Sequence, residues 1–425
     1  MRTSRRQFLT TSLAGFGLPV FLPSALDAVE RSLEPFAGLD AGTAARTQEF
    51  WDEIKQAFHV SPDFINLENG YCSPQPNVTL ESLQNQIRRI NATPSYYMRR
   101  QRAEEHLRVK RELAELAGAP VEEIVITRNT TESMDTVIHG LDLHPGDEAV
   151  MTNQDYGSML EAFRQQSRRR GIRCIEIGLP LHPRDDEEIV GTYEAAITPK
   201  TRLLLLTHMI NVTGQILPAR KICDMAHAHG VEVIIDAAHS FAQVVFDIPD
   251  LGGDYFGASL HKWLCTPLGA GILQINSEKI RNVWPLFGET SVPEDDIRKF
   301  ERIGTQPVWT VAAIPDAIRF HRMIGGNRKE ERLRYLQQHW TDRVREIPRV
   351  ILNTPAGQRA CAIANFGIKG RSPGEVADLL FDRYHLLTVA IDMEAVKGVR
   401  VTPHLYTSLS DLDALVSAIR EMAAS

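Results

Sequence analysis

The feature that most constrains the fold is the alternation of short apolar runs with longer amphipathic stretches between residues 121 and 276. Two of these runs, Arg202–His208 and Val231–Asp236, are apolar at consecutive positions, so strands made of them would be buried on both faces. Strands of that kind occur in largely parallel sheets that helices cover on both sides. The pattern therefore predicts an α/β domain with a mainly parallel sheet between layers of helices.

The individual elements of this domain can be assigned to residues. The apolar runs predict strands at Val121–Thr127, Glu148–Thr152, Arg173–Ile177, Arg202–His208 and Val231–Asp236. The amphipathic stretches predict helices at Glu132–Leu141, Ser158–Arg170 and Arg220–His229, the last of which ends at Gly230.

The pattern changes after Val292, where longer helical stretches dominate. They predict helices at Ala312–Ile324, Arg328–Ile347 and Gly374–Tyr384, a final helix capped at Ser410, and strands at Cys361–Ile368 and Gly398–Thr402. We therefore expect a smaller α+β domain at residues 292–425. The large domain would span residues 62–291, and residues 29–61 would pack on the small domain.

The first 28 residues have the composition of an export signal. Arg5 and Arg6 precede an apolar stretch at Phe8–Leu22, and small residues lie near Ala25 and Ala28 without a clean cleavage site. The paired arginines resemble the twin-arginine motif, although a basic N-terminus with an apolar patch is the plainer alternative. We expect the twin-arginine machinery to export the folded protein, which would make it periplasmic.

Charge and cysteine content exclude several classes of protein. The formal net charge of −7 argues against a large nucleic-acid-binding surface, and no apolar run is long enough for stable membrane insertion. The cysteines are scattered and never form a Cys-X-X-Cys pair, so we expect neither a disulfide framework nor a metal site. They are Cys72, Cys174, Cys223, Cys265 and Cys361. Proteins that bind a cofactor inside the cell are commonly exported in the folded state.

One lysine lies in an apolar sequence context. Lys262 has Leu260, Trp263 and Leu264 as near neighbours, and desolvation of an ammonium group is costly unless the group is paired or used. Desolvation also lowers the pKa of a lysine, which favours imine chemistry with a carbonyl cofactor. Taken alone, Lys262 could equally be a structural lysine with its amine at the surface.

Two further polar groups follow predicted strands. Asp236 ends a buried strand, at the sheet edge where ligands bind in α/β proteins, and it could pair with a protonated pyridine nitrogen or cap a helix. Thr130 and Thr131 follow another strand at the start of a helix, where they could bind an anion, form a capping box, or do both.

Four motifs occur together in the order and spacing of fold-type I pyridoxal-phosphate enzymes. They are Thr130-Thr131-Glu132-Ser133, Asn211-Val212-Thr213-Gly214, Asp236-Ala237-Ala238-His239 and Ser259-Leu260-His261-Lys262-Trp263. From about residue 62 to the C-terminus, the chain resembles the class V aminotransferase family. That family includes cysteine desulfurases, isopenicillin N epimerase-like proteins and kynureninase relatives. The resemblance implies a mainly parallel, seven-stranded sheet and pyridoxal 5′-phosphate as the cofactor.

The resemblance also implies a role for each matching residue. Lys262 would hold the cofactor covalently and move the proton at the substrate Cα, and Asp236 would hold the pyridine nitrogen. The remaining cofactor contacts would come from Thr130, Thr131, Tyr156, Asn211, His239, Ser259 and His261. His239 and Asn211 would lie near the 3′-oxygen of the ring, and Tyr156 would stack on the ring unless it is a core tyrosine. The phosphate would be held by Thr130, Thr131, Ser259 and His261.

The substrate and the partner subunit are assigned in the same way. Arg400 matches the arginine that grips the substrate α-carboxylate, although an ordinary surface arginine is the alternative. The loop Asn66–Tyr71 would lie on the substrate side, with Asn69 as a substrate contact. The segment Glu301–Thr305 resembles one that reaches the neighbouring subunit's phosphate, so a homodimer is implied, with Thr305 at the partner's site.

The chain departs from the desulfurase pattern. No cysteine lies between Ser372 and Thr407, where desulfurases carry a nucleophilic cysteine, and His239 stands where they carry glutamine. The sequence thus favours an exported enzyme acting at the α-amino centre of an amino acid or peptide-linked amino acid, by transamination or a related oxidative change. Some exported relatives tailor secreted peptides such as siderophores. Epimerase or lyase chemistry and a non-catalytic binding protein are the alternatives.

Overall fold

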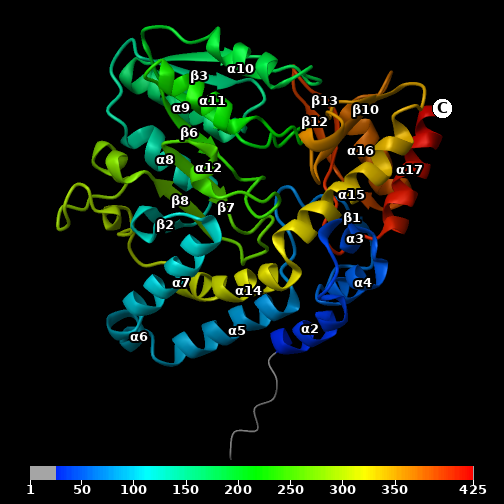
Figure 1. Ribbon diagram of the computed structural model, residues 1–425, viewed down its shortest axis with the longest axis horizontal. Coiled ribbons are helices and arrows are strands. Elements are labelled where there is room, and N and C mark those ends of the chain that lie inside the picture. Colours follow the sequence, from blue (N-terminus) through cyan, green and yellow to red (C-terminus); the bar gives the residue numbers. More distant parts are fainter. Residues whose placement is uncertain (1–24, 425) are drawn as a thin grey trace, which may run out of the picture.

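The computed structural model describes residues 25–424, and a seven-stranded sheet forms its largest part (Figure 1). The strand order is β2-β8-β7-β6-β5-β3-β4, and β8 alone runs antiparallel to its two neighbours. The strands are β2 (Ile124–Thr127), β3 (Glu148–Thr152), β4 (Arg173–Ile177), β5 (Thr201–Thr207), β6 (Glu232–Asp236), β7 (Tyr255–Ser259) and β8 (Gly271–Ile275). The expected α/β class with a mainly parallel sheet is confirmed.

Helices cover both faces of this sheet, as the apolar runs require. Along β5, Leu204 and Leu206 face one hydrophobic core, and Leu203 and Leu205 face the other. The first core includes α7 (Arg102–Ala117), α10 (Asp186–Glu194), α11 (Ala219–Ala228) and α12 (Ile248–Leu251). The second includes α8 (Thr130–Gly140) and α9 (Gly157–Arg170). The alternation of side chains along a strand therefore explains why four consecutive leucines are all buried.

A second, smaller sheet lies beside the first (Figure 1). It is antiparallel, with the order β12-β13-β10-β9. Its strands are β9 (Val350–Leu352), β10 (Ala364–Ile368), β12 (Val389–Asp392) and β13 (Lys397–Val401). The helices α15 (Gly326–Val344), α16 (Pro373–Tyr384) and α17 (Leu409–Ala424) contribute to the hydrophobic core around it. The expected α+β architecture of this part of the chain is therefore present.

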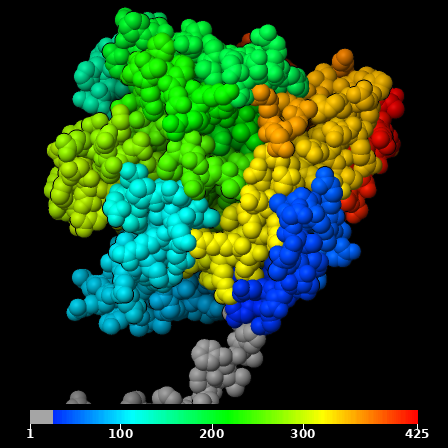
Figure 2. Space-filling model, in the orientation of Figure 1, coloured from blue at the N-terminus to red at the C-terminus, as the bar shows by residue number. Residues whose placement is uncertain are grey.

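The first described helices lie against the C-terminal part of the chain, as the space-filling view shows (Figure 2). They are α2 (Ala25–Leu33), α3 (Ala41–Arg46) and α4 (Gln48–Gln56), and α3 packs on α15. The helices α5 (Asn77–Ala92), α6 (Pro94–Arg100), α13 (Val308–Ala312) and α14 (Ile314–Ile324) complete the lower part of the molecule in Figure 1. A short parallel pair joins β1 (Ile65–Asn66) to β11 (Leu386–Leu387).

Five short 3₁₀ helices in the described chain complete the set of elements. They are η1 (Glu34–Phe36), η2 (Val121–Glu123), η3 (Ser277–Asn282), η4 (Ile297–Phe300) and η5 (Gly357–Arg359).

Some predicted boundaries are wrong. The strand expected from Val121 begins only at Ile124, because η2 occupies the first three residues after Pro120. The last helix begins at Leu409 and not at Ser410. Its cap is the reciprocal pair of Ser408 and Asp411, in which each side chain accepts a hydrogen bond from the other residue's amide.

The N-terminal signal falls mostly outside the described residues, which begin at position 25. Residues 25–28 of that predicted segment form the first turn of α2, and the Leu26 side chain is buried in a core with Phe50 and Trp51. Within residues 25–424, no helix combines the length and apolar character needed to cross a membrane.

Candidate active site

A cavity of about 250 Å³ opens at the carboxyl ends of three adjacent strands of the large sheet. The last residues of β5, β6 and β7, which are Thr207, Asp236 and Ser259, line it. Ligands bind at this edge of a parallel α/β sheet because the polar ends of the strands and the helix N-termini meet there. The topology therefore brings residues that are distant in the sequence to one site.

Lys262 lies in the turn that follows β7 and reaches into this cavity. Its Nζ lies 3.0 Å from Nε2 of His239. Burial lowers the pKa of Lys262 to about 8, while the negative charge of Asp236 opposes that shift. A substantial fraction of this amine is therefore neutral near neutral pH, as a nucleophilic amine must be.

Neighbouring side chains fix the turn that carries Lys262. The adjacent Trp263 is fully buried, and its ring stacks on His404 with the ring centroids 5.5 Å apart. Its carbonyl oxygen accepts a hydrogen bond from Nζ of Lys329, a buried lysine of α15. The turn after β7 is thus held by α15 and by the segment that follows β13.

Asp236 is a buried carboxylate in the lining of the same cavity. It is 3% exposed, and its Oδ1 accepts a hydrogen bond of 2.9 Å from the amide of Ala238. Burial raises the pKa of Asp236, while the charge of Lys262 lowers it. A buried carboxylate is costly unless a cation or hydrogen bonds compensate it, so this position suits a ligand that carries a positive charge.

Two buried polar atoms of the lining have no hydrogen-bond partner among residues 25–424: Nδ1 of His239 and Oδ1 of Asn211. Burial lowers the pKa of His239 well below its usual range, and the nearby charges of Lys262 and Arg400 act in the same direction. The imidazole nitrogen can donate or accept one more hydrogen bond, depending on the tautomer, and the amide oxygen can accept one. Both residues are therefore able to bind polar groups of a ligand.

The start of α8 forms the other end of the cavity. The amide of Thr130 donates to Oγ of Ser259 over 2.9 Å, and the two side-chain hydroxyls lie 2.7 Å apart. The side chain of Asn129 caps the helix, so Thr130 is not the cap, and Thr131 is partly exposed. Hydroxyls and amides at a helix N-terminus form an anion site.

Close packing beside this anion site depends on a glycine. A Cβ on Gly271 of β8 would lie 2.7 Å from Oγ1 of Thr127 and 2.8 Å from the backbone of Asn129. His261 lines the same end of the cavity, and its Nδ1 lies 3.2 Å from the carbonyl oxygen of Ala270. Burial lowers the pKa of His261, so this ring contributes hydrogen bonding and not a fixed charge.

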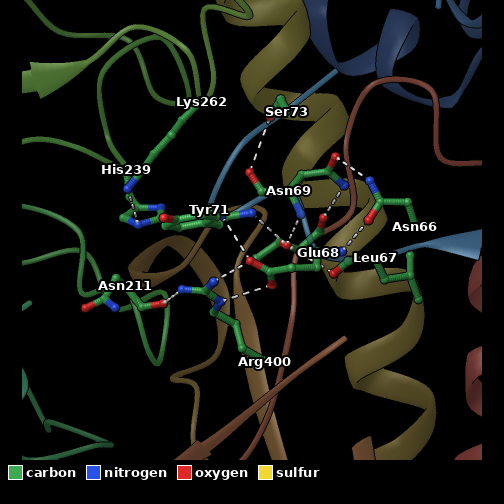
Figure 3. A network of polar contacts seen from close by, with 12 residues as sticks. Asn66, Leu67, Glu68, Asn69, Tyr71, Ser73, Asn211, His239, Lys262 and Arg400 are labelled. Atoms are coloured by element: carbon green, nitrogen blue, oxygen red, sulfur yellow. Dashed lines mark hydrogen bonds and ion pairs between the residues drawn. The ribbon is translucent and has the colours of Figure 1, made fainter. Parts of the chain in front are cut away.

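Arg400 enters the cavity from β13 of the four-stranded sheet and is already paired with another residue (Figure 3). Its Nη2 donates to Oε1 of Glu68 over 2.5 Å, and its Nε donates to Oε2 over 3.4 Å. Its Nη1 donates to the carbonyl oxygen of Asn211 over 3.1 Å. The side chains of Arg400 and Glu68 are 8% and 13% exposed, so the pair is largely removed from water.

The mouth of the cavity is lined by Tyr71, Cys72 and Tyr156. Tyr156 immediately precedes α9 and is 42% exposed, so it is not a core tyrosine. Tyr71 is 71% exposed. Cys72 is half-buried, and burial raises the pKa of its thiol despite the opposing charge of Lys262.

The structure brings together ten of the expected site residues and leaves two apart. The ten in the cavity are Thr130, Thr131, Tyr156, Asn211, Asp236, His239, Ser259, His261, Lys262 and Arg400. Asn69 was expected to contact the substrate, but its fully buried amide bonds to the carbonyl of Thr402 and the hydroxyl of Tyr406. Thr305 is exposed and lies outside the cavity lining of its own chain.

The sequence-based predictions missed Glu68 and Gly70, although they assigned the loop of these residues to the substrate side. A Cβ on Gly70 would lie 3.0 Å from Cζ of Arg400, so the backbone there packs directly against the guanidinium group. No local signal reveals these contacts, because Glu68 and Arg400 are 332 positions apart. A carboxylate in a loop close to a glycine is the only hint that the sequence offers.

Four features of the cavity fit pyridoxal phosphate. Asp236, a buried carboxylate with no ion pair among the described residues, suits a pyridine nitrogen, and the unpaired atoms of His239 and Asn211 suit the polar groups of the ring. The hydroxyl-rich start of α8 suits the phosphate. Lys262, with its lowered pKa, is the residue that would hold the cofactor covalently.

Comparisons with known proteins agree with this fit. The family model described as aminotransferase class-V matches residues 65–412. Isopenicillin N epimerase of Amycolatopsis lactamdurans is 26% identical over 393 residues, which cover 88% of this chain and 98% of that protein. The same enzyme of Streptomyces clavuligerus is 24% identical over 391 residues, with 87% and 97% covered.

A solved structure of similar fold is a mutant of the protein C-DES with glycine covalently linked to its PLP cofactor. It matches with a TM-score of 0.77 and 20% identity, and the match covers 86% of this chain and 99% of that one. The family model spans most of the described chain, and class V proteins use pyridoxal phosphate. The chain therefore belongs to the class V aminotransferase family of pyridoxal-phosphate-dependent enzymes.

Proposed function

We propose that the protein acts at the α-amino centre of an amino acid or a peptide-linked amino acid, by transamination or a related oxidative change. The observation that carries the proposal is that Lys262, Asp236 and Arg400 line one cavity. A nucleophilic amine, a buried carboxylate and a guanidinium group are the three groups needed to hold the cofactor and to orient an amine substrate.

Each of these residues has a defined task. When bound, pyridoxal phosphate withdraws electrons from the carbon next to the substrate amine. Asp236 would hold the ring nitrogen and favour its protonated form, because a buried carboxylate is stabilised by a positive partner. Lys262 accepts and returns the proton at the substrate Cα, and His239, 3.0 Å from Nζ, orients that amine.

Epimerisation is the second candidate, because two of the relatives are isopenicillin N epimerases. An epimerase needs a proton donor on each face of the substrate carbon. Lys262 would serve one face, and the side chains at the mouth, Tyr71 and Tyr156, are available to the other. Lyase chemistry would need a β-leaving group on the substrate.

Cysteine desulfuration has less support. Among the described residues, Cys72 is the only cysteine that lines the cavity, and burial raises the pKa of its thiol, which disfavours the thiolate. Cys361 is fully buried in the core that also contains Trp263. Neither position offers the exposed, low-pKa cysteine that sulfur transfer requires.

We further propose that the protein is exported in folded form to the periplasm by the twin-arginine route, and that it acts there as a homodimer. The export proposal rests on Arg5, Arg6 and the apolar stretch that follows them. The dimer proposal rests on the resemblance of the segment Glu301–Thr305. In the structure, Glu301 of this segment pairs with the buried Lys110 over 2.7 Å.

A substrate screen tests the proposed reaction. Purified enzyme loaded with cofactor is mixed with single L-amino acids and short peptides, and the cofactor absorption, 2-oxo products and enantiomers are measured. Transamination predicts a spectral change with a 2-oxo product. A D-enantiomer without a 2-oxo product would assign the enzyme to epimerisation instead. A cofactor absorption spectrum that no tested amino acid or peptide changes would indicate a non-catalytic binding protein.

A further inference from the structure

Three of the five N–H donors of the Arg400 guanidinium are used within the protein, which leaves one on Nη1 and one on Nη2. All three of its nitrogens donate within the protein: two to Glu68 and one to the carbonyl of Asn211. Because Glu68 approaches from the Nε and Nη2 side, it occupies one of the edges on which a guanidinium group binds a carboxylate through two hydrogen bonds (Figure 3). A free substrate carboxylate would have to displace Glu68 or bind beside it.

Glu68 is held firmly in this position. Its Oε1 also accepts a hydrogen bond of 3.0 Å from the amide of Tyr71. The following amides, those of Asn69 and Gly70, donate to Oγ1 of Thr402 over 2.6 and 3.0 Å. Because Thr402 follows β13, the loop that carries Glu68 is fastened to the strand that carries Arg400.

The balance of charges in the cavity also disfavours binding of a substrate carboxylate. Among the lysines and arginines of the described chain, Lys262 and Arg400 line the cavity. Lys262 is committed to the cofactor and faces the charge of Asp236. The charge of Arg400 is balanced by Glu68, 2.5 Å away. No uncompensated cation in the described lining is therefore left for a substrate carboxylate, which would instead meet the negative charge of Glu68.

We propose that Glu68 is a specificity-determining residue, which adapts the Arg400 subsite to a neutral acyl group. The substrate would then carry its α-carboxyl group in an amide bond, as the N-terminal residue of a peptide does. The N–H groups of Arg400 not used by Glu68 and Asn211 would donate to the carbonyl oxygen of that amide. This proposal rests on the proposed function and narrows its substrate class.

Spectroscopic titration tests the proposal without requiring turnover. L-Amino acids and their carboxamides are titrated in matched pairs into the cofactor-loaded enzyme, and each dissociation constant is taken from the change in cofactor absorption. The unaltered enzyme should bind the carboxamide more tightly than the acid. Glu68→Gln removes the negative charge and should shift the ratio of the two constants toward the acid by roughly tenfold or more.

Controls separate this proposal from a merely structural role and from failure of the proposed function. Glu122→Gln, at an exposed position, should leave the ratio unchanged. A spectrum that neither series changes would overturn the proposed function. Spectral changes in which Glu68→Gln keeps the same ratio of acid to carboxamide dissociation constants would overturn the role of Glu68. If that variant does not fold, tighter binding of free acids than of carboxamides by the unaltered enzyme would equally overturn that role.

Discussion

The chemistry of single residues in this protein depends on burial more than on sequence neighbours. Burial shifts the pKa values of Lys262, His239 and Asp236 in the direction that favours the neutral form of each side chain, because each is removed from water. In Lys262 the carboxylate of Asp236 offsets part of that shift. The site therefore presents a reactive amine at a pH where an exposed lysine would be almost fully protonated.

The lowered pKa of Lys262 predicts the pH dependence of cofactor loading. Only the neutral amine can attack an aldehyde, so the rate at which apoprotein captures pyridoxal phosphate should rise with pH around a midpoint near 8. Stopped-flow absorption at a series of pH values measures this rate. The exposed-site variant Lys200→Ala should keep the same midpoint. A midpoint near the ordinary lysine value of about 10.4 would show that burial does not activate this amine.

At this scale the sequence reveals the chemistry-bearing residues but not their partners. Lys262 and Asp236 stand out because an apolar context makes a charge costly. Glu68 has no such context, and its role depends on Arg400, which lies 332 positions away in the sequence. The Asn69 side chain, which was expected to contact the substrate, bonds instead to Thr402 and Tyr406, while its neighbour Gly70 lines the cavity.

At the scale of elements, apolar periodicity predicted the strands of the large sheet well. The strands expected at Glu148–Thr152 and Arg173–Ile177 have the same bounds in the structure. The periodicity does not predict the position of β8, which pairs antiparallel between β2 and β7. Strand order depends on contacts between distant segments, and a local pattern carries no information about them.

The junction between the loop Asn66–Tyr71 and the end of β13 depends on one hydroxyl. Oγ1 of Thr402 accepts from two buried amides and donates to the carbonyl oxygen of Leu67. Thr402→Val should leave these groups unpaired and lower the free energy of unfolding by about 2 kcal/mol or more. Urea denaturation measures the change, and Thr402→Ser, which keeps the hydroxyl, is the matched control. No loss in Thr402→Val, or a larger loss in Thr402→Ser than in Thr402→Val, would contradict the role of the hydroxyl.

At the scale of the whole molecule, the first helix of the described chain is joined to α14, nearly 300 residues later in the sequence. Arg319 of α14 pairs with Asp27 and Glu30 of α2, each over 2.7 Å. The family and the α/β architecture follow from motifs and periodicity in the sequence. The arrangement of the seven-stranded and four-stranded sheets around one cavity does not, because it depends on packing between segments hundreds of residues apart.

The export proposal is tested on the intact precursor. Replacing Arg5 and Arg6 with lysine should keep the protein in the cytoplasm, because the receptor reads the arginine pair and not the charge alone. Cell fractionation and immunoblotting measure the distribution, and Arg2→Lys serves as the control outside the pair. Normal export of the doubly substituted protein would remove the twin-arginine assignment while leaving the proposed chemistry intact.

The covalent bond between protein and cofactor can be located directly. The purified protein is reduced with borohydride, digested, and mapped by mass spectrometry. We expect the mass of the reduced cofactor on the peptide that contains Lys262, and its loss in Lys262→Ala but not in Lys221→Ala. Cofactor on another lysine, or an unmodified Lys262 in a protein that retains bound pyridoxal phosphate, would refute the role of Lys262 on which the proposed chemistry depends.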